Sequence, residues 1–315
     1  MSDAIPTPTA ASPDGGSTPV RRVPTTALVL AGGGLAGIAW ELGVLQGLAD
    51  VDPALAARVL ASDVVVGTSA GSVVGAQVTV ATSADPSPTL EQLYAAQRVD
   101  ATAELSADLD LTSFAQRLAA ATAGARSAAE VRRAVGAFAL AADTVPAQER
   151  LAVIRTRLPR PQWPERDLRV VTLDAQSGER RVLDRHSGVD LALAIAASCA
   201  VPGIWPVVAI DGHHYTDGGV HSGANADVAA GCDIVLVLSP TLPDGPTMLG
   251  RPLADELVDL GPAAVHVIYA DADSVAAFGA NPLSPTTRPP SAAAGREVGR
   301  AHAARVAALL GPTAA

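Results

Sequence analysis

The sequence of 315 residues contains no lysine and few aromatic residues, which make up 3% of the chain. All 22 basic residues are arginine, and 32 acidic residues outnumber them, so the formal net charge is −10 and the isoelectric point is about 5.0. Nucleic acids and anionic membranes attract proteins through clustered positive charge. The composition therefore argues against nucleic-acid binding, and it makes any transient contact with a membrane surface hydrophobic rather than electrostatic.

Long apolar runs and cysteines are also scarce. No uninterrupted apolar run reaches the roughly 18 residues that indicate a transmembrane helix. Cys199 and Cys232 are too few for a disulfide framework, and their spacing is not that of a metal site. We expect two reduced thiols and no metal or cofactor.

Arg21 and Arg22, followed by apolar residues through Leu30, resemble a twin-arginine export signal. The same apolar run leads directly into the glycines at 32–34, which the site described below requires in the mature protein. We therefore expect no cleavage there and a cytoplasmic protein, at most peripheral to a membrane.

The chain divides into a tail and one large domain. Residues 1–24 are rich in Pro, Ser and Thr and are predicted to be disordered, whereas 25–311 have the hydrophobic content of a folded domain. Two β-loop-α units come first, with strands at 27–30 and 63–66 and helices from Ile38 and Ser72. Ala-rich helical periodicity then predicts a helical cap or insertion at about 86–159.

Strand-like and helix-like segments alternate in the rest of the domain. This alternation predicts an α/β fold with three layers, αβα, around a mostly parallel central sheet. The expected strands are 168–173, 180–183, 207–210, 234–238 and 265–269, with helices near 190–198 and 253–260, a Pro-rich loop at 282–290 and a closing helix at 292–310.

The strongest local motif is the GxSxG pentapeptide with Gly67, Ser69 and Gly71. It follows a hydrophobic strand and precedes a helix, which is the context of a nucleophile elbow. Such a turn exposes the serine Oγ, and the helix N-terminus faces the negative charge that develops during acyl transfer. Ser69 is thus the candidate nucleophile; the alternative is a plain glycine-rich turn.

A second glycine cluster, GGGLAG, begins at Gly32 and ends at Gly37, again between a strand and a helix. Bare backbone N–H groups at such a loop suit an oxyanion hole or a phosphate cradle. The letters also fit the dinucleotide-binding GxGxxG pattern, but that fold needs an acidic residue at the end of its second strand. Here the second strand ends at Ser69, so one site built from both glycine clusters explains more.

A serine nucleophile needs a group that accepts its proton. None of the six histidines stands in a compelling context, and in the order serine, acid, histidine only His221, His266 or His302 follows Asp217. The aspartate itself stands in the segment Asp217-Gly218-Gly219, where two glycines present a carboxylate on a bare backbone. From the residues alone this segment also fits a hairpin turn. The full set of histidines is His186, His213, His214, His221, His266 and His302.

Together, the glycine loop, the GxSxG elbow and the distant Asp-Gly-Gly motif resemble the patatin-like phospholipase family, over about residues 26–285. Two more stretches are similar to that family: 43–45 in the helix after the glycine loop, and 198–202 with 205–207 before the aspartate. The resemblance implies a Ser69–Asp217 dyad without histidine. It also implies oxyanion donors at Gly32, Gly33 and Gly34, with Gly37, Gly67, Gly71, Gly218 and Gly219 as motif glycines.

One position departs from the family pattern, because Ala36 stands where the family usually has Arg or Lys. A cation there would favour an anionic intermediate or a phosphate headgroup, so its absence puts phospholipid preference in doubt more than hydrolysis. The expected activity is hydrolysis of carboxylic esters of lipids, of the phospholipase A, lysophospholipase or esterase type. The alternatives are an acyltransferase that uses the same serine, and a non-catalytic module that binds a lipid or a dinucleotide.

Overall fold

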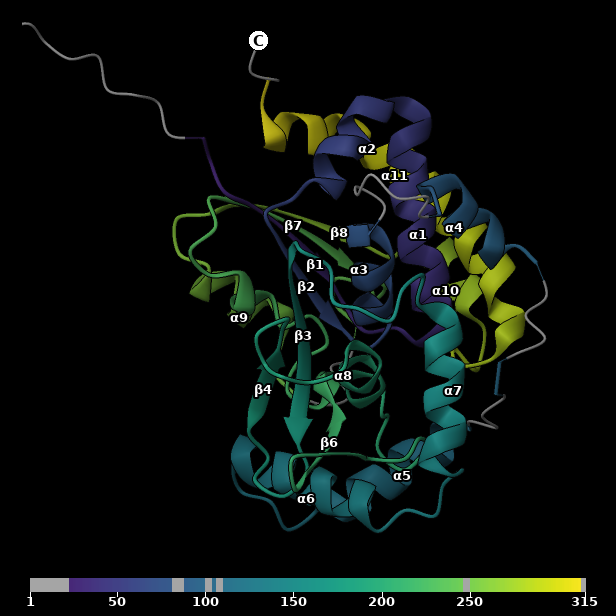
Figure 1. The fold of residues 1–315 in the computed structure, drawn as a ribbon, viewed down its shortest axis with the longest axis vertical. Coiled ribbons are helices and arrows are strands. Elements are labelled where there is room, and N and C mark those ends of the chain that lie inside the picture. Colours follow the sequence, from purple (N-terminus) through teal and green to yellow (C-terminus); the bar gives the residue numbers. More distant parts are fainter. Residues whose placement is uncertain (1–22, 81–87, 100–103, 106–109, 246–249, 313–315) are drawn as a thin grey trace, which may run out of the picture.

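The computed structural model describes residues 23–80, 88–99, 104–105, 110–245 and 250–312. Residues 1–22, most of the predicted tail, lie outside the described residues. Within them, one sheet has the strand order β5-β6-β3-β2-β1-β7-β8, with β4 beside β3 (Figure 1). The strands are β1 (Thr26–Leu30), β2 (Val64–Thr68), β3 (Asp167–Asp174), β4 (Arg180–Leu183), β5 (Val208–Ile210), β6 (His213–Asp217), β7 (Ile234–Ser239) and β8 (Ala264–Tyr269).

Strands β3, β2, β1, β7 and β8 are mutually parallel, whereas β4, β5 and β6 pair antiparallel. The predicted mostly parallel sheet is therefore confirmed. The helices are α1 (Gly34–Val51), α2 (Pro53–Leu60), α3 (Ala70–Val80), α4 (Leu90–Gln97), α5 (Leu111–Thr122), α6 (Ala128–Leu140), α7 (Ala147–Arg157), α8 (Leu191–Ser198), α9 (Leu253–Asp259), α10 (Ala272–Phe278) and α11 (Arg288–Leu310), with 3-10 turns η1 (Gly218–Val220), η2 (Ala226–Ala229) and η3 (Pro285–Thr287).

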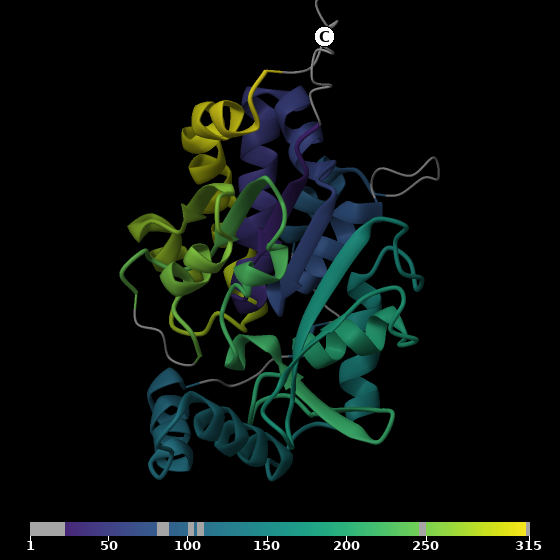
Figure 2. The same cartoon turned by 90° about the vertical axis from the view of Figure 1, so that its left-hand side faces the viewer.

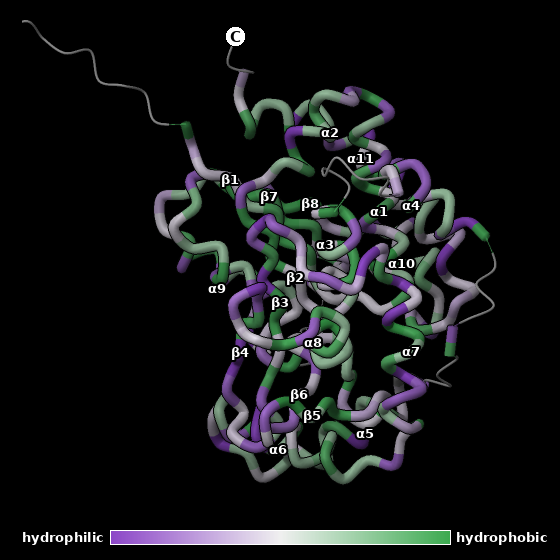
Figure 3. The backbone as a smooth tube through the Cα atoms, viewed as in Figure 1, coloured by the Kyte–Doolittle hydropathy of each residue, from purple (hydrophilic) through white to green (hydrophobic). Residues whose placement is uncertain are grey.

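Alternate residues of β1 face two different cores, as strand geometry requires. Leu28 and Leu30 pack in the core that includes α1, α3 and α11, whereas Ala27 and Val29 pack with η2 and residues near α9. Figures 1 and 2 show helices on both sides of the sheet, and Figure 3 shows hydrophobic residues gathered along the central strands. The three-layer α/β fold is thus confirmed.

Helix α1 is held against α11 by glycines on both helices. A Cβ at Gly43 would lie 2.3 Å from the Ala292 carbonyl oxygen, and a Cβ at Gly299 would lie 2.1 Å from the Val44 oxygen. The two backbones can approach this closely only without side chains at these positions. The long C-terminal helix therefore fixes α1, and with it the glycine loop at the start of α1.

The predicted loop at 282–290 is wrong at its end, because α11 already begins at Arg288. Pro289 and Pro290 lie in the first turn of the helix, where the missing N–H costs no hydrogen bond. Two helices, α2 and α10, and strand β6 were also not anticipated. Strand β6 ends at Asp217, which places the aspartate at a strand terminus.

Four helices, α4 to α7, occupy the described part of the region at 86–159. Helices α5 and α6 lie side by side at the lower end of the molecule in both ribbon views (Figures 1 and 2). Their apolar residues Phe114, Leu118 and Val135 pack against Leu173 of β3 and Val220 of η1. This helix pair therefore covers the segment that directly follows Asp217.

Candidate active site

Ser69 stands on a strained turn between β2 and α3. Its φ of 52° lies in the left-handed region, which non-glycine residues rarely adopt. Surrounding side chains hold the turn: Ser198 Oγ accepts the Ser69 N–H at 2.9 Å, and Ser72 Oγ donates to the Ser69 carbonyl oxygen at 2.6 Å. With 7% of its surface exposed, Ser69 sits in the geometry of a nucleophile elbow.

The two glycines of the pentapeptide are required by close backbone contacts. A Cβ at Gly71 would lie 2.0 Å from the Leu30 carbonyl oxygen of β1, and a Cβ at Gly67 would lie 2.5 Å from the Ser72 Cα. These separations are far below van der Waals contact. The elbow is therefore packed tightly against the end of β1.

Strand register brings Asp217 to Ser69 although the two residues are far apart in sequence. Val171 of β3 pairs with Thr68 of β2, and the next residue, Thr172, pairs with Asp217 of β6. Strand β4 occupies the opposite side of β3 at both positions. The ends of β2 and β6 therefore meet end to end on the same side of β3.

The Asp217 carboxylate is buried, with 5% of the residue exposed, and burial raises its pKa to about 6. The Gly219 N–H, which donates to Asp217 Oδ1 at 2.7 Å, and the Ser69 side chain oppose this rise because they favour the charged form. Gly218 lets the turn pass close to β3, since a Cβ there would lie 2.4 Å from the Val171 oxygen. A carboxylate with this pKa is largely ionised at neutral pH and is a stronger base than an exposed aspartate.

The loop that starts at Gly32 lies against the elbow. A Cβ at Gly32 would be 3.4 Å from the Ser69 Cβ, and one at Gly37 would be 3.2 Å from the Ala70 Cβ. The Gly32 N–H donates to the Gly223 oxygen at 2.8 Å, so the expectation that Gly32 supplies an oxyanion donor needs revision. Within the described residues, the N–H groups of Gly33 and Gly34 have no such partner, as is usual at the N-terminus of a helix.

The glycine loop is packed closely against Pro240, Pro282 and Leu283. A Cβ at Gly33 would lie 2.6 Å from the Pro240 side chain, and one at Gly34 would lie 2.8 Å from Leu283 and from the Pro282 oxygen. A dinucleotide fold leaves this backbone open to the ligand. The geometry therefore favours a site that uses the loop together with Ser69.

No histidine among the described residues forms a hydrogen bond with Ser69 or Asp217. His221 Nδ1 pairs with Asn225 Oδ1 at 3.1 Å, and His266 Nε2 pairs with His302 Nδ1 at 3.0 Å. The three histidines that follow Asp217 in the sequence, and could therefore complete a serine–acid–histidine triad, are thus hydrogen-bonded to other residues. The arrangement brings together a serine and an aspartate alone.

Sequence reasoning missed two arginines of α7 that line a small cavity with Ser69. The cavity measures about 20 Å³, which is room for about one water molecule. Arg150 and Arg157 lie in its wall together with Trp205. Both arginines stand on the same face of α7 as Leu151 and Ile154, and their place in this apolar stripe was the available signal.

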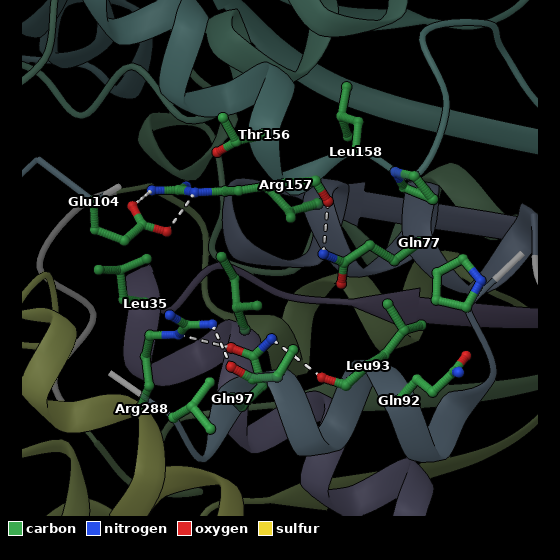
Figure 4. Close-up of a pocket in the computed structure, with 16 residues that line it drawn as sticks. Leu35, Gln77, Gln92, Leu93, Gln97, Glu104, Thr156, Arg157, Leu158 and Arg288 are labelled. Carbon is green, nitrogen blue, oxygen red and sulfur yellow. Dashed lines mark hydrogen bonds and ion pairs between the residues drawn. The ribbon is translucent and has the colours of Figure 1, made fainter. Parts of the chain in front are cut away.

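A larger pocket of about 470 Å³ adjoins this cavity (Figure 4). Leu35, Ile38 and Arg157 contribute to the walls of both. In Figure 4 the Arg157 guanidinium reaches Glu104, with Nε to Oε1 at 3.0 Å. Arg157 lines both spaces, whereas Glu104 lines the larger one. The residues shared by both walls place the larger pocket next to the cavity that contains Ser69.

Within the described residues, no cluster of three or more histidine, cysteine, aspartate or glutamate side chains has the arrangement of a metal site. In the same part of the chain, every helix is too short or too polar to cross a membrane.

The fold and the site define a three-layer α/β protein with a serine on a strand-turn-helix elbow and an aspartate at its side. A family model described as patatin-like phospholipase matches residues 28–230, which is more than half of the chain. The chain belongs to the patatin-like phospholipase family, as its motifs predicted. A search of curated proteins gave no match.

Two solved structures are similar to the chain. VipD from Legionella pneumophila has 12% sequence identity and a TM-score of 0.36, and the type III effector protein ExoU has 16% identity and a TM-score of 0.38. The similarity covers 70% and 90% of this chain, respectively, but 50% and 53% of those chains. The chain therefore spans about half the length of each.

Proposed function

We propose that this chain is a serine acyl hydrolase that cleaves carboxylic esters of lipids by a Ser69–Asp217 dyad. The observation that carries the proposal is the buried Asp217 carboxylate beside Ser69 on its strained elbow, at the N-terminus of α3. Family membership supports the lipid as the class of substrate.

In the proposed reaction, Ser69 Oγ attacks the ester carbonyl carbon while Asp217 takes the hydroxyl proton. The N–H groups of Gly33 and Gly34 stabilise the oxyanion, together with the N–H of Ala70, which follows the nucleophile at the start of α3. Asp217 then returns the proton to the leaving alcohol, and water hydrolyses the acyl-enzyme with Asp217 again as base.

The substrate needs more room than the cavity at Ser69 now offers. We place its acyl chain in the adjoining pocket, whose walls include the apolar residues Leu35, Leu93 and Leu158. Side chains that line both spaces, such as Arg157, must move for an ester to reach Ser69. This requirement favours slow turnover of small generic esters.

A fluorophosphonate probe tests the nucleophile directly. We expect one adduct, mapped to Ser69 by mass spectrometry, and hydrolysis of p-nitrophenyl butyrate in the presence of chelator. Ser69→Ala should lose both, whereas Ser113→Ala, a change at an exposed serine, should keep both. An adduct on another residue, or hydrolysis that survives in Ser69→Ala, would refute the proposal.

The dyad also predicts the pH dependence. Since Asp217 has a pKa of about 6 and must be ionised to accept a proton, kcat/KM for p-nitrophenyl butyrate should be constant above pH 7 and fall about tenfold per pH unit below 6. His221→Gln and His266→Gln should leave this profile unchanged. Loss of activity in either histidine variant would support a triad instead.

A further inference from the structure

Arg150 is a buried cation with two guanidinium nitrogens that have no hydrogen-bond partner among the described residues. The residue is 6% exposed, and within the described residues its Nε and Nη1 atoms are buried and donate to no acceptor. Leaving a guanidinium unpaired in the interior is costly, and a ligand that supplies an anion would remove this cost. Because Arg150 and Ser69 line the same cavity, such an anion would lie beside the nucleophile.

The neighbouring charges do not neutralise Arg150. Glu104 is already bound by Arg157 through Nε and Nη2. Burial and the nearby Arg157 lower the pKa of Arg150 to about 10, so it still carries its charge at neutral pH. Burial also raises the pKa of the Cys199 thiol, which therefore stays neutral. The charged side chains in the described lining of the cavity are thus Arg150 and Arg157, with the Asp217 carboxylate at Ser69 as a nearby negative charge.

The orientation of Arg150 suits a phosphate or carboxylate. Its Cζ lies 3.9 Å from the centroid of the Trp205 ring, which is itself 4% exposed. A guanidinium stacked on an aromatic face keeps its N–H groups in the plane, where two of them can bind two oxygens of one anion. Trp205 therefore holds the cation in place without using its hydrogen-bond donors.

We propose that Arg150 binds the phosphate group of a phospholipid whose acyl ester is cleaved at Ser69, an inference that rests on the proposed hydrolase function. In a glycerophospholipid the sn-2 ester and the phosphate are attached to adjacent glycerol carbons, so a single small site can contact both. The glycine loop offers no cation, because its non-glycine residues are Leu35 and Ala36. Arg150 supplies from α7 the charge that the loop lacks.

The test compares a phosphate-bearing ester with a neutral one. Soluble dihexanoylphosphatidylcholine and dihexanoylglycerol carry the same acyl groups and differ in the headgroup. The wild type should prefer the phospholipid, and Arg150→Gln should lower the ratio of the two kcat/KM values by about 10–100-fold, the range for a hydrogen bond to a charged group. Arg155→Gln, an exposed change on the same helix, should leave both values unchanged.

Inhibition of the wild type separates a lipid phosphate from free phosphate and needs no variant. Butyl phosphate should inhibit p-nitrophenyl butyrate hydrolysis competitively, inorganic phosphate more weakly, and butanol not at all at the same concentration. Equal inhibition by inorganic and butyl phosphate would overturn the assignment to a lipid headgroup. If Arg150→Gln does not fold, these inhibition results and the substrate ratio of Arg150→Lys decide the proposal.

The inference and the proposed function fail in different ways. An unchanged substrate ratio in Arg150→Gln, with Ser69 still labelled by fluorophosphonate, would refute the role of Arg150 and leave the hydrolase intact. If Ser69 is not labelled and no ester is cleaved, the hydrolase fails. Butyl phosphate should then still raise the melting temperature of the wild type and not of Arg150→Gln; no rise in the wild type would refute the anion site as well.

Discussion

We expect Asp217→Asn to lower kcat/KM for p-nitrophenyl butyrate by about a thousandfold or more while making the folded protein more stable at pH 8. The loss of activity follows because asparagine keeps the size and the contact with the Gly219 N–H but cannot take the Ser69 proton. Removal of a general base costs roughly 10²–10⁴-fold in rate. Fluorophosphonate labelling should slow in parallel, since it uses the same activated hydroxyl.

The gain in stability follows from the direction of the Asp217 pKa shift. Folding raises this pKa from its usual 3.8 to about 6, so the ionised form is less stable in the folded protein than in the unfolded chain. The stability that the protonated form provides is fully present below pH 4 and lost as the pH rises through 6. At pH 8, Asp217→Asn should therefore raise the free energy of unfolding by on the order of 3 kcal/mol, or the melting temperature by roughly 5 °C.

The stability difference between Asp217→Asn and the wild type should vanish near pH 4. Glu256, whose pKa burial raises to about 7, is present in both proteins, so its contribution to stability cancels in the comparison.

Asp227→Asn is a control for which the opposite change in stability is expected. Burial would raise the pKa of Asp227, but its ion pair with Arg180 lowers this pKa overall. That variant should be less stable at pH 8 and fully active. Retained hydrolysis in Asp217→Asn would exclude this aspartate as the base.

The second large effect is expected for Gly71→Ala, which should lower the free energy of unfolding by at least about 3 kcal/mol. The added methyl would lie 2.0 Å from the Leu30 carbonyl oxygen, and neither backbone can move without separating the elbow from β1. Urea unfolding followed by circular dichroism measures the change. Activity should be lost even at temperatures where the variant is folded, because the shift displaces Ser69 from Asp217.

Two glycines serve as matched controls for Gly71→Ala. At Gly75, one turn further along α3, the nearest atom to an added methyl is the flexible Leu168 Cδ1 at 2.9 Å, so Gly75→Ala should cost less. At Gly124 nothing lies within 4 Å, so Gly124→Ala should change stability by less than about 0.5 kcal/mol. Equal stability of all three variants would contradict the tight packing of the elbow.

The elbow could be predicted from sequence because its signals are local. A buried strand at 64–66, small residues around Ser69 and a following helix are all contained within about fifteen residues. The glycine loop and the alternation of strands and helices are also recognised from residues that are close together in the sequence. Strand β6 was harder, because His213 to Asp217 is short and polar at its start, and pairing with β3 rather than propensity makes it a strand.

Arg150 was missed for a related reason. An arginine in an Ala-rich helical segment is usually solvated, and only its position within the apolar stripe of α7 distinguishes it. Whether such a residue is buried depends on what packs against the helix. Here Trp205, 55 positions away, covers it.

The sequence by itself determined the fold class and the candidate nucleophile, since strand, turn and helix preferences depend on near neighbours. Asp217 became the candidate base only because the ordered motifs together resemble the patatin-like phospholipase family. Only the tertiary structure decided that Asp217 lies beside Ser69, that the Gly32 N–H donates to the Gly223 oxygen, and that Arg150 lines the same cavity as Ser69. These contacts join residues that are remote in the chain. Strand register and helix packing determine these long-range contacts, and neither can be predicted from a local pattern of residues.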